Sequence, residues 1–344
     1  MRDNRDLHSV RAQLGALALA AFAFAHPASA QGTELRLSTF VPPVHVIARE
    51  IITPWMAEVE KDSGGEVKPK LYPSMQLGGS PPGLFRQAVE GVVDMVFTLP
   101  GYTSPAFPRT QMVELPGLSP DGRAATELLW KLLDPYLKPE YEGTKVIALW
   151  AAEDAGLMTR GKAIKSLEDL KGLRMRSPSA AQARQLAVMG ATPVAMPITE
   201  VYPGLDRGVI DGSMVPFSTI LDFRLGEVAK GYTIPGPLFG RSSFLIAMNQ
   251  KKFDSLSPKA KAAIEKHSGL QLSLKATDVY IKRAEQGVDS VRGKAEVIEF
   301  SKAEQERIAK VLRPIVDDWV TEAEAKGIPA KQMLGVAQHP AGTQ

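Results

Sequence analysis

The 344-residue sequence contains no cysteine and only five histidines. Without cysteine the chain can form no disulfide bond, no thiolate metal site and no cysteine nucleophile. None of the histidines has a second histidine three or four residues away, and the H-E-x-x-H and G-x-S-x-G motifs of zinc and serine hydrolases are also missing. These absences weaken the interpretation as an enzyme, and we expect no catalytic residue, no metal and no cofactor.

The sequence also lacks a long apolar run and any concentration of basic residues. Lys and Arg number 41 against 38 Asp and Glu, a formal net charge of +3, and no basic stripe of the kind that binds nucleic acid stands out. We therefore expect no nucleic-acid partner. No segment after residue 30 is apolar over the ~20 residues that a membrane-spanning helix requires.

The first 30 residues have the pattern of a secretory signal peptide. Three arginines precede the apolar run LGALALAAFAFA (14–25), and A-S-A at 28–30 supplies the small residues of a cleavage site. The alternative is an amino-terminal membrane anchor, but twelve apolar residues are too few to cross a bilayer. We expect export, cleavage near Gln31, and a mature chain long enough for two lobes.

Strand-like and helix-like runs alternate along the mature chain, which predicts an α/β fold. A helix is expected from about residue 44 to 62, and an apolar stripe at helical spacing from 308 to 320 is interrupted by Pro314, which should kink it. The runs that predict strands are TELRLSTF, EVKPKLY, VVDMVFTL, KVIALWAA, GLRMRS, TPVAMP, VIDGSMVP and SFLIAMN.

Two segments resemble each other weakly. PGLFRQAVEGVVDMV (82–96) and PGLDRGVIDGSMV (203–215) both run from P-G-L through a helical piece to a glycine and a strand. The spacing differs, so ordinary turn chemistry and a pair of similar lobes both remain possible explanations.

Several candidate binding residues lie in the loops that follow strands. Ligands of open α/β sheets bind outside the carboxyl ends of the strands, and the loops there contain His45, Leu99, Tyr102, Arg176 and Phe217. Each has a structural alternative: the histidine can cap a helix, and the aromatic residues can belong to the core. Burying an unpaired guanidinium is costly, so Arg176 should have either an acidic partner in the protein or an anionic ligand.

Four segments resemble the solute-binding proteins of tripartite ATP-independent periplasmic (TRAP) transporters, the DctP-like family. LYPSMQLGGSP (71–81) is similar to the family's Y-P-x-x-x-L-G, and EGVVDMVF (90–97) to its G-x-x-D strand. SLEDLKGLRMRSP (166–178) resembles S-x-x-D-L-K-G-L-K-I-R-x-P. The fourth segment, GATPVAMPITEVYPGLDRGVIDG (190–212), resembles G-A-x-P-x-x-M-x-x-x-E-V-Y-x-A-L-Q-x-G-x-V-D-G.

The resemblance implies a two-lobed periplasmic-binding-protein fold with a hinge, closing over one small carboxylate that is delivered to the membrane permease subunits of the transporter. It implies a periplasmic location. By motif position it also implies that Arg176 grips the carboxylate, which suits the two-pronged match of guanidinium and carboxylate. Ser179 occupies a position that often contacts the ligand.

Departures from the family pattern bear on the ligand. Val215 stands where some members have asparagine, Ile198 stands where many have phenylalanine, and DGSMV replaces the D-G-x-E-W of relatives linked to a metal-bridged 2-oxo acid. A second arginine of sugar-acid binders is absent from AEDAGLM (152–158). Because unpaired buried polar groups are penalised, an apolar cleft around one charge favours an apolar or aromatic monocarboxylate.

For the division of the chain, we expect residues 31–152 plus 245–300 to form the first lobe and 153–244 the second. Residues 301–334 should be a helical segment across both lobes, followed by a loose tail at 335–344. Two other functions remain open: an exported enzyme acting on an organic acid, and a ligand-presenting partner of a membrane sensor.

Overall fold

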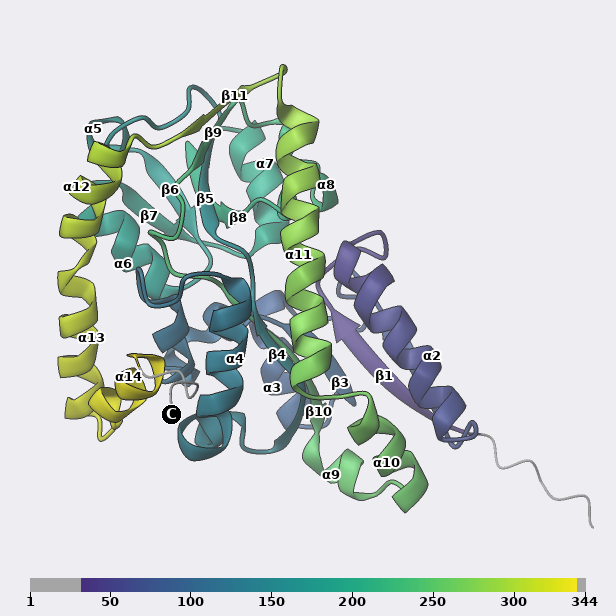
Figure 1. Ribbon diagram of the computed structural model, residues 1–344. Coiled ribbons are helices and arrows are strands. Elements are labelled where there is room, and N and C mark those ends of the chain that lie inside the picture. Colours follow the sequence, from purple (N-terminus) through teal and green to yellow (C-terminus); the bar gives the residue numbers. More distant parts are fainter. Residues whose placement is uncertain (1–31, 339–344) are drawn as a thin grey trace, which may run out of the picture.

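Two separate β-sheets, each flanked by helices, form the framework of residues 32–338, the part of the chain that this computed structural model describes (Figure 1). The first sheet has five strands in the order β2 (Val67–Tyr72), β1 (Thr33–Thr39), β3 (Met95–Thr98), β10 (Ser243–Asn249) and β4 (Thr144–Ala151). The second has six, in the order β11 (Glu296–Glu299), β9 (Gly231–Ile234), β5 (Ala155–Thr159), β8 (Gly212–Pro216), β6 (Arg174–Ser177) and β7 (Thr192–Ala195). The expected two-lobed α/β fold is confirmed.

The two sheets share one arrangement of strands. In the first, β1 pairs in parallel with β2 and β3, and β10 is antiparallel to β3. In the second, β6 pairs in parallel with β7 and β8, and β5 is antiparallel to β8. The strands β3 and β8 are therefore equivalent, and each follows a short helix, α3 (Leu84–Val89) or α7 (Val201–Asp206). The two similar sequence segments fall on these equivalent elements.

Burial explains which runs form the central strands. All four residues of β3 and all seven of β10 are buried, as expected for strands covered on both faces. Phe97, Trp150 and Phe244 stack across the first sheet, with ring centroids 5.5 to 6.0 Å apart. This aromatic cluster forms the part of the core that lies beneath the site described below.

The chain crosses between the lobes at residues 152–154 and 235–242, where Ala152 N donates to Ser242 O at 2.9 Å. The 22-residue helix α11 (Leu270–Val291) packs on β4 in the first lobe and on α8 (Thr219–Asp222) in the second (Figure 1). It leads into β11, which pairs with β9. Residues 296–299 thus belong to the second sheet and not to the first lobe, contrary to the prediction, because no sequence pattern indicates that this helix runs between the lobes.

The carboxyl-terminal helices also contact both lobes. Helix α12 (Lys302–Leu312) ends where Pro314, which has no N–H to donate, begins α13 (Pro314–Ala325). Arg307 of α12 bonds Glu168 of the second lobe, and Trp319 Nε1 of α13 donates to Pro108 O of the first lobe at 3.4 Å. The last helix, α14 (Ala330–Gln338), packs on α4 and includes residues 335–338, which the sequence analysis assigned to a loose tail.

Of the remaining elements, the α-helices are α2 (Thr53–Asp62), α4 (Gly122–Leu132), α5 (Leu167–Leu170), α6 (Ala180–Val188), α9 (Gln250–Asp254) and α10 (Pro258–Lys266). The short π- and 3-10 helices are η1 (Ala48–Ile52), η2 (Pro81–Gly83), η3 (Pro100–Ala106), η4 (Thr110–Glu114), η5 (Leu133–Leu137), η6 (Lys138–Tyr141), η7 (Ile198–Glu200) and η8 (Leu225–Glu227). Within the described residues no helix is both long and apolar enough to cross a membrane.

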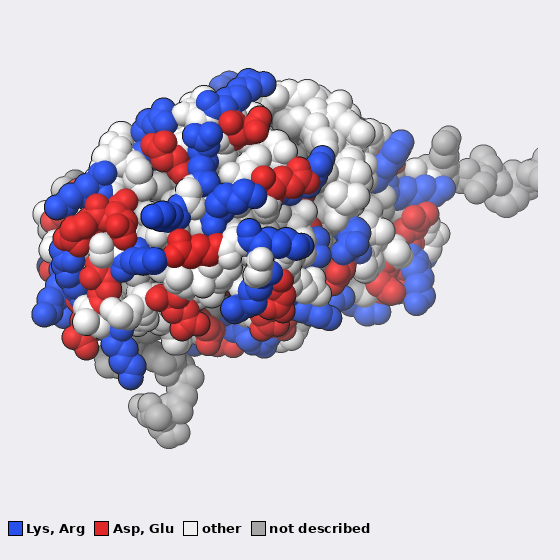
Figure 2. All heavy atoms as spheres, turned by 90° about the horizontal axis from the view of Figure 1, so that it is seen from above, with Lys and Arg blue, Asp and Glu red and all other residues white. Residues whose placement is uncertain are grey.

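The expected signal peptide lies outside the described residues. The surface of the rest is mixed in charge: on the face seen from above in Figure 2, Lys and Arg are interspersed with Asp and Glu.

Candidate functional site: a cavity between the lobes

A small cavity lies where the two lobes meet, lined by residues of both. It is reached by the loops after β1 and β3 in the first lobe and after β6 and β8 in the second, the carboxyl ends of parallel strands. Helix α11 and the crossing segment before β10 complete its wall. Its lining is largely apolar and aromatic: Phe40, His45, Leu99, Tyr102, Arg176, Pro178, Ile198, Val215, Pro216, Thr219, Phe223, Ser242, Phe244 and Tyr280.

Arg176 is the only Lys or Arg among these lining residues. It lies near the end of β6, where Pro178 prevents the strand from continuing, and is only 2 % exposed. Its Nε donates to Met196 O at 2.8 Å, and no Asp or Glu among residues 32–338 lies within ion-pair distance. Burial lowers its pKa, with Tyr102 opposing the shift. Of the two alternatives for Arg176, an acidic partner within the protein is not found in this part of the chain.

Arg174, two residues earlier on the same strand, provides a contrast. It is exposed, and its guanidinium pairs with Asp211, with Nη2 and Oδ1 2.7 Å apart. One arginine of the strand is thus paired with an acidic residue, whereas the other lines the cavity without an acidic partner among residues 32–338.

Tyr102 lies beside this guanidinium. Its hydroxyl oxygen accepts a hydrogen bond from Ile198 N at 3.0 Å, which leaves the hydroxyl proton free to be donated. Burial raises the pKa of Tyr102, and the charge of Arg176 opposes this shift. The pair therefore presents three or more hydrogen-bond donors and one positive charge at a single point of the wall.

His45 is buried at a different part of the cavity. Its Nδ1 accepts from Ile47 N at 3.2 Å, so its hydrogen is on Nε2, which lies 3.7 Å from Asp222 Oδ2. Burial lowers the pKa of His45 to about 4, although the charge of Asp222 opposes this, so the ring is neutral near pH 7. Asp222 is itself paired with Arg283, whose Nη2 lies 2.5 Å from Oδ1.

The lobes are closed over the cavity by contacts on both sides. Ile198 N of the second lobe donates to Tyr102, and Val46 N of the first lobe donates to Asp222 Oδ2 at 3.1 Å. Ala180 N also donates to Ser104 Oγ across the lobes at 3.0 Å. A ligand in this cavity would be enclosed, and its release would require these contacts to break.

Six of the eight expected binding residues line the cavity, namely His45, Leu99, Tyr102, Arg176, Ile198 and Val215. Phe217 does not. Its ring turns into the second lobe against Tyr232, with centroids 5.7 Å apart, and fills space left by Gly156, where a Cβ would lie 2.3 Å from Phe217 Cζ. Phe217 is therefore a residue of the core and not of the cavity wall.

Ser179 is also absent from the lining. Its hydroxyl caps α6 by accepting from Gln182 N at 3.2 Å, and it donates to the buried carboxylate of Glu114 in the first lobe. Burial raises the pKa of Glu114 to about 7, despite the opposing hydrogen bonds from Ser179 and Ser243. Ser179 therefore joins the lobes next to the cavity.

The sequence analysis missed four aromatic residues of the wall: Phe40, Phe223, Phe244 and Tyr280. Phe40 follows β1 in a loop that was singled out, so the rule of strand ends could have found it. Phe244 belongs to an antiparallel strand and Tyr280 to α11, and no motif marks either.

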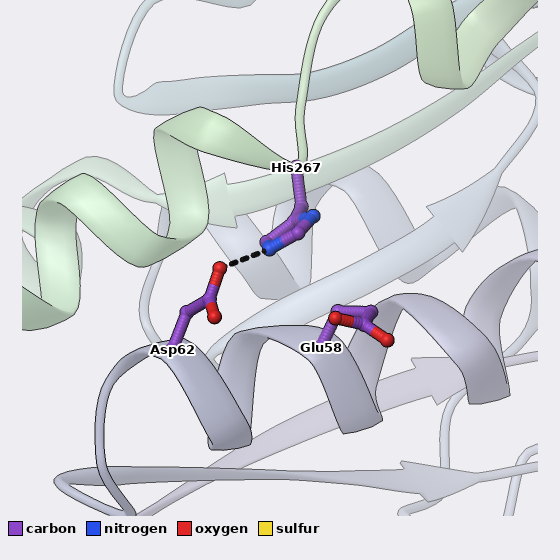
Figure 3. A group of neighbouring side chains, drawn as sticks. All are labelled: Glu58, Asp62 and His267. Carbon is purple, nitrogen blue, oxygen red and sulfur yellow. Dashed lines mark hydrogen bonds and ion pairs between the residues drawn. The ribbon is translucent and has the colours of Figure 1, made fainter.

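A second cluster, of residues that do not line the cavity, contains groups of the kind that bind metals. Glu58 and Asp62 lie one turn apart on α2, and His267 follows α10, with one ligand atom of each within 4.8 Å of the others (Figure 3). Asp62 Oδ2 already accepts from Lys266 Nζ and is 2.7 Å from His267 Nε2. These bonds lower the pKa of Asp62 to about 2. A cation would have to displace the lysine ammonium, so the contacts are explained as an ion-pair cluster joining α10 to α2.

Comparison with known proteins agrees with this geometry. Residues 37–322 match the family model of the bacterial extracellular solute-binding proteins, family 7 (DctP). A TRAP solute-binding protein from Rhodoferax ferrireducens, solved with copurified benzoate, is 30% identical, with a TM-score of 0.86 over 89% of this chain and 96% of that one. One from a marine metagenome, specific for aromatic acid ligands and solved with 3-hydroxybenzoate, is 30% identical, with a TM-score of 0.84 over 89% and 97%.

The C4-dicarboxylate-binding periplasmic protein DctP of Rhodobacter capsulatus is 25% identical over 79% of this chain and 82% of its own. The family model covers most of the chain, and the fold of these relatives extends over nearly all of it. The chain belongs to family 7 of the bacterial extracellular solute-binding proteins, the DctP family, and is a TRAP solute-binding protein.

Proposed function

We propose that this protein captures an aromatic monocarboxylate, of the size of benzoate, in the cavity between its lobes and delivers it to the membrane permease of a TRAP transporter. The observation that carries the proposal is Arg176, a buried guanidinium that faces an apolar cavity and has no acidic partner among residues 32–338. A buried charge of this kind is stable only when a counter-ion compensates it. A ligand carboxylate, held as a two-pronged ion pair, is the natural counter-ion.

Tyr102, next to Arg176, also supports carboxylate binding at this part of the cavity. Its free hydroxyl proton can be donated to a carboxylate oxygen that Arg176 also binds, which satisfies one more lone pair of the anion. Guanidinium and phenol together would fix both the charge and the orientation of the carboxylate.

The apolar residues of the remaining wall favour aromatic acids over sugar acids as ligands. Leu99, Ile198, Val215, Phe223 and Phe244 offer no hydrogen-bonding side chains, so each hydroxyl of a sugar acid that faced them would lose its water partners without replacement. An aromatic ring has no hydrogen bonds to water to lose there, and it gains contacts with the rings of the wall.

Binding without turnover fits these residues better than catalysis. The one histidine of the lining, His45, is neutral, and its Nδ1 is occupied by Ile47 N. Among the lining residues none of the hydroxyl groups hydrogen-bonds to it, so no nucleophile–base pair of the kind used in covalent catalysis is formed there.

Calorimetric titration of purified protein, first unfolded and refolded to remove any copurified acid, tests the proposal. We expect benzoate to bind at least about 30-fold more tightly than benzamide, its uncharged counterpart, because the amide cannot neutralise the guanidinium. D-Glucuronate should bind weakly, since most of its hydroxyl groups would meet apolar side chains. Tighter binding of glucuronate than of benzoate, or equal binding of benzoate and benzamide, would contradict the proposal.

The family is extracellular, and we propose that export proceeds through a signal peptide cleaved near Gln31. The basic amino terminus, short apolar run and A-S-A site support this step. The intact mass of protein recovered from the periplasm should correspond to a chain that begins near residue 31. A mass that still includes residues 1–30 would show that the leader is retained as an anchor.

A further inference from the structure

Two buried polar groups of the cavity have no role in holding a carboxylate at Arg176. The hydroxyl of Tyr280, a residue only 2 % exposed, makes no hydrogen bond with any residue from 32 to 338. The Nε2–H of His45, also 2 % exposed, has its nearest acceptor at 3.7 Å, beyond hydrogen-bond distance. The rings of these two residues are 6.1 Å apart and nearly perpendicular. Buried polar groups of this kind normally have partners.

Their position relative to Arg176 follows from a row of aromatic rings. Tyr102, beside the guanidinium, contacts Phe40 with centroids 5.6 Å apart, and Phe40 contacts Phe97 at 5.8 Å. Phe97 contacts Phe244 at 6.0 Å, and Phe244 contacts Tyr280 at 4.9 Å. Tyr280 therefore lies at the other end of this row from the guanidinium, and His45 lies beside it, 6.1 Å from Tyr280 and 6.4 Å from Phe97 between ring centroids.

The charges near Tyr280 limit what its partner can be. The carboxylate of Asp222 lies 3.7 Å from His45 Nε2, and after burial Glu153 and Asp222 raise the pKa of Tyr280 further. Glu153 is buried in the segment between the lobes, and its Oε2 has no hydrogen-bond partner. A second carboxylate on the ligand would be repelled here, whereas a neutral hydroxyl can accept from His45 and exchange a hydrogen bond with Tyr280.

We propose that Tyr280 and His45 form a second recognition point, which selects aromatic acids carrying a neutral hydroxyl group on the far side of the ring from the carboxylate. This inference rests on the proposed function, because it takes the carboxylate to be bound at Arg176. It predicts a preference for meta- or para-hydroxylated acids. An ortho-hydroxyl would lie next to the carboxylate and could not reach Tyr280.

The test is calorimetry with four ligands: benzoate and its 2-, 3- and 4-hydroxy derivatives. The 3- or the 4-hydroxy acid should bind about 3- to 10-fold more tightly than benzoate, the effect of roughly one hydrogen bond. The 2-hydroxy acid should show no such gain, and isophthalate and terephthalate should bind more weakly than benzoate. In Tyr280→Phe the ratio of hydroxybenzoate to benzoate affinity should fall to about one.

Tyr232→Phe is the matched control. Tyr232 is likewise buried with an unpartnered hydroxyl, but it packs on Phe217 in the second lobe and does not line the cavity. This variant should keep the wild-type ratio, and thermal unfolding should show that both variants are folded.

Outcomes that overturn the inference differ from those that overturn the proposed function. If wild-type protein binds benzoate but neither the 3- nor the 4-hydroxy acid more tightly, the second recognition point is wrong and the function stands. The same holds if the preference survives in folded Tyr280→Phe, or if a dicarboxylate binds more tightly than benzoate. If none of these acids binds, the proposed function itself fails.

Discussion

Replacing Arg176 by alanine should weaken the binding of benzoate by about 30-fold to several thousand-fold, equivalent to about 2–5 kcal/mol. The loss is large because a carboxylate enclosed by the closed lobes would have no positive charge near it. Arg176→Lys retains the charge but not the planar, two-pronged geometry, so it should also bind benzoate weakly, with at least a tenfold loss as an order-of-magnitude estimate. Calorimetric titration of each variant measures both effects.

Arg174→Ala is the control for this experiment. Arg174 lies on the same strand and is ion-paired with Asp211 at the surface, outside the cavity lining, so its removal should leave the affinity for benzoate within about twofold. If Arg176→Ala is folded and binds as tightly as the wild type, then Arg176 is a structural residue and the assignment of the site is wrong. Thermal unfolding separates that outcome from simple loss of structure.

Gly240→Ala should lower the free energy of unfolding by about 3 kcal/mol, at the upper end of the range for overpacking. A Cβ at this position would lie 1.6 Å from the backbone oxygen of Glu114, so one of two backbone segments has to move. Gly240 belongs to the segment that crosses between the lobes, and its N donates to Gln185 Oε1 at 3.0 Å. Gln185 Nε2 in turn donates to Glu114 O at 2.8 Å, so the shift would disturb a junction shared by both lobes.

Chemical denaturation measures this effect, with Gly161→Ala as the matched control. A Cβ at Gly161 would meet nothing within 4 Å, and its φ is not in the left-handed region, so this variant should be unchanged or slightly more stable. Equal stability of Gly240→Ala and the wild type would mean that the crossing segment does not approach Glu114 this closely.

The sequence predicted the parts of the site that follow from strand ends and family motifs. Arg176 comes two residues before Pro178, which ends a parallel strand, and His45, Leu99 and Tyr102 follow two other strands of the same kind. Because the carboxyl ends of parallel strands meet in one crevice, their loops converge whatever the details of packing. That rule placed these residues correctly at the cavity.

The rule of strand ends does not predict the direction in which a single side chain points. Phe217 follows a strand as expected, but it turns inward because Gly156, 61 positions earlier in the sequence, leaves room for its ring. Ser179 is held by Glu114, a residue of the other lobe. In both cases the partner is distant in sequence, so no local pattern predicts the outcome.

The role of helix α11 was not predicted for a related reason. Helix α11 supplies Tyr280 to the cavity and carries the chain from the first lobe to the second, and its position depends on packing against α4, β4 and α8. An amphipathic helical pattern does not specify which of two lobes it will cover. The assignment of residues 296–299 to the wrong lobe follows directly from that ambiguity.

The insertion of β10 between β3 and β4 has a consequence for the order in which the chain can fold. Among residues 32–338, strand β4 pairs only with β10, which is about 90 residues further along, after the chain has passed through β5 to β9. A chain emerging from a translocation channel therefore completes most of the second sheet before the first can close. Such long-range pairing slows folding, so the first sheet should be the later of the two to form.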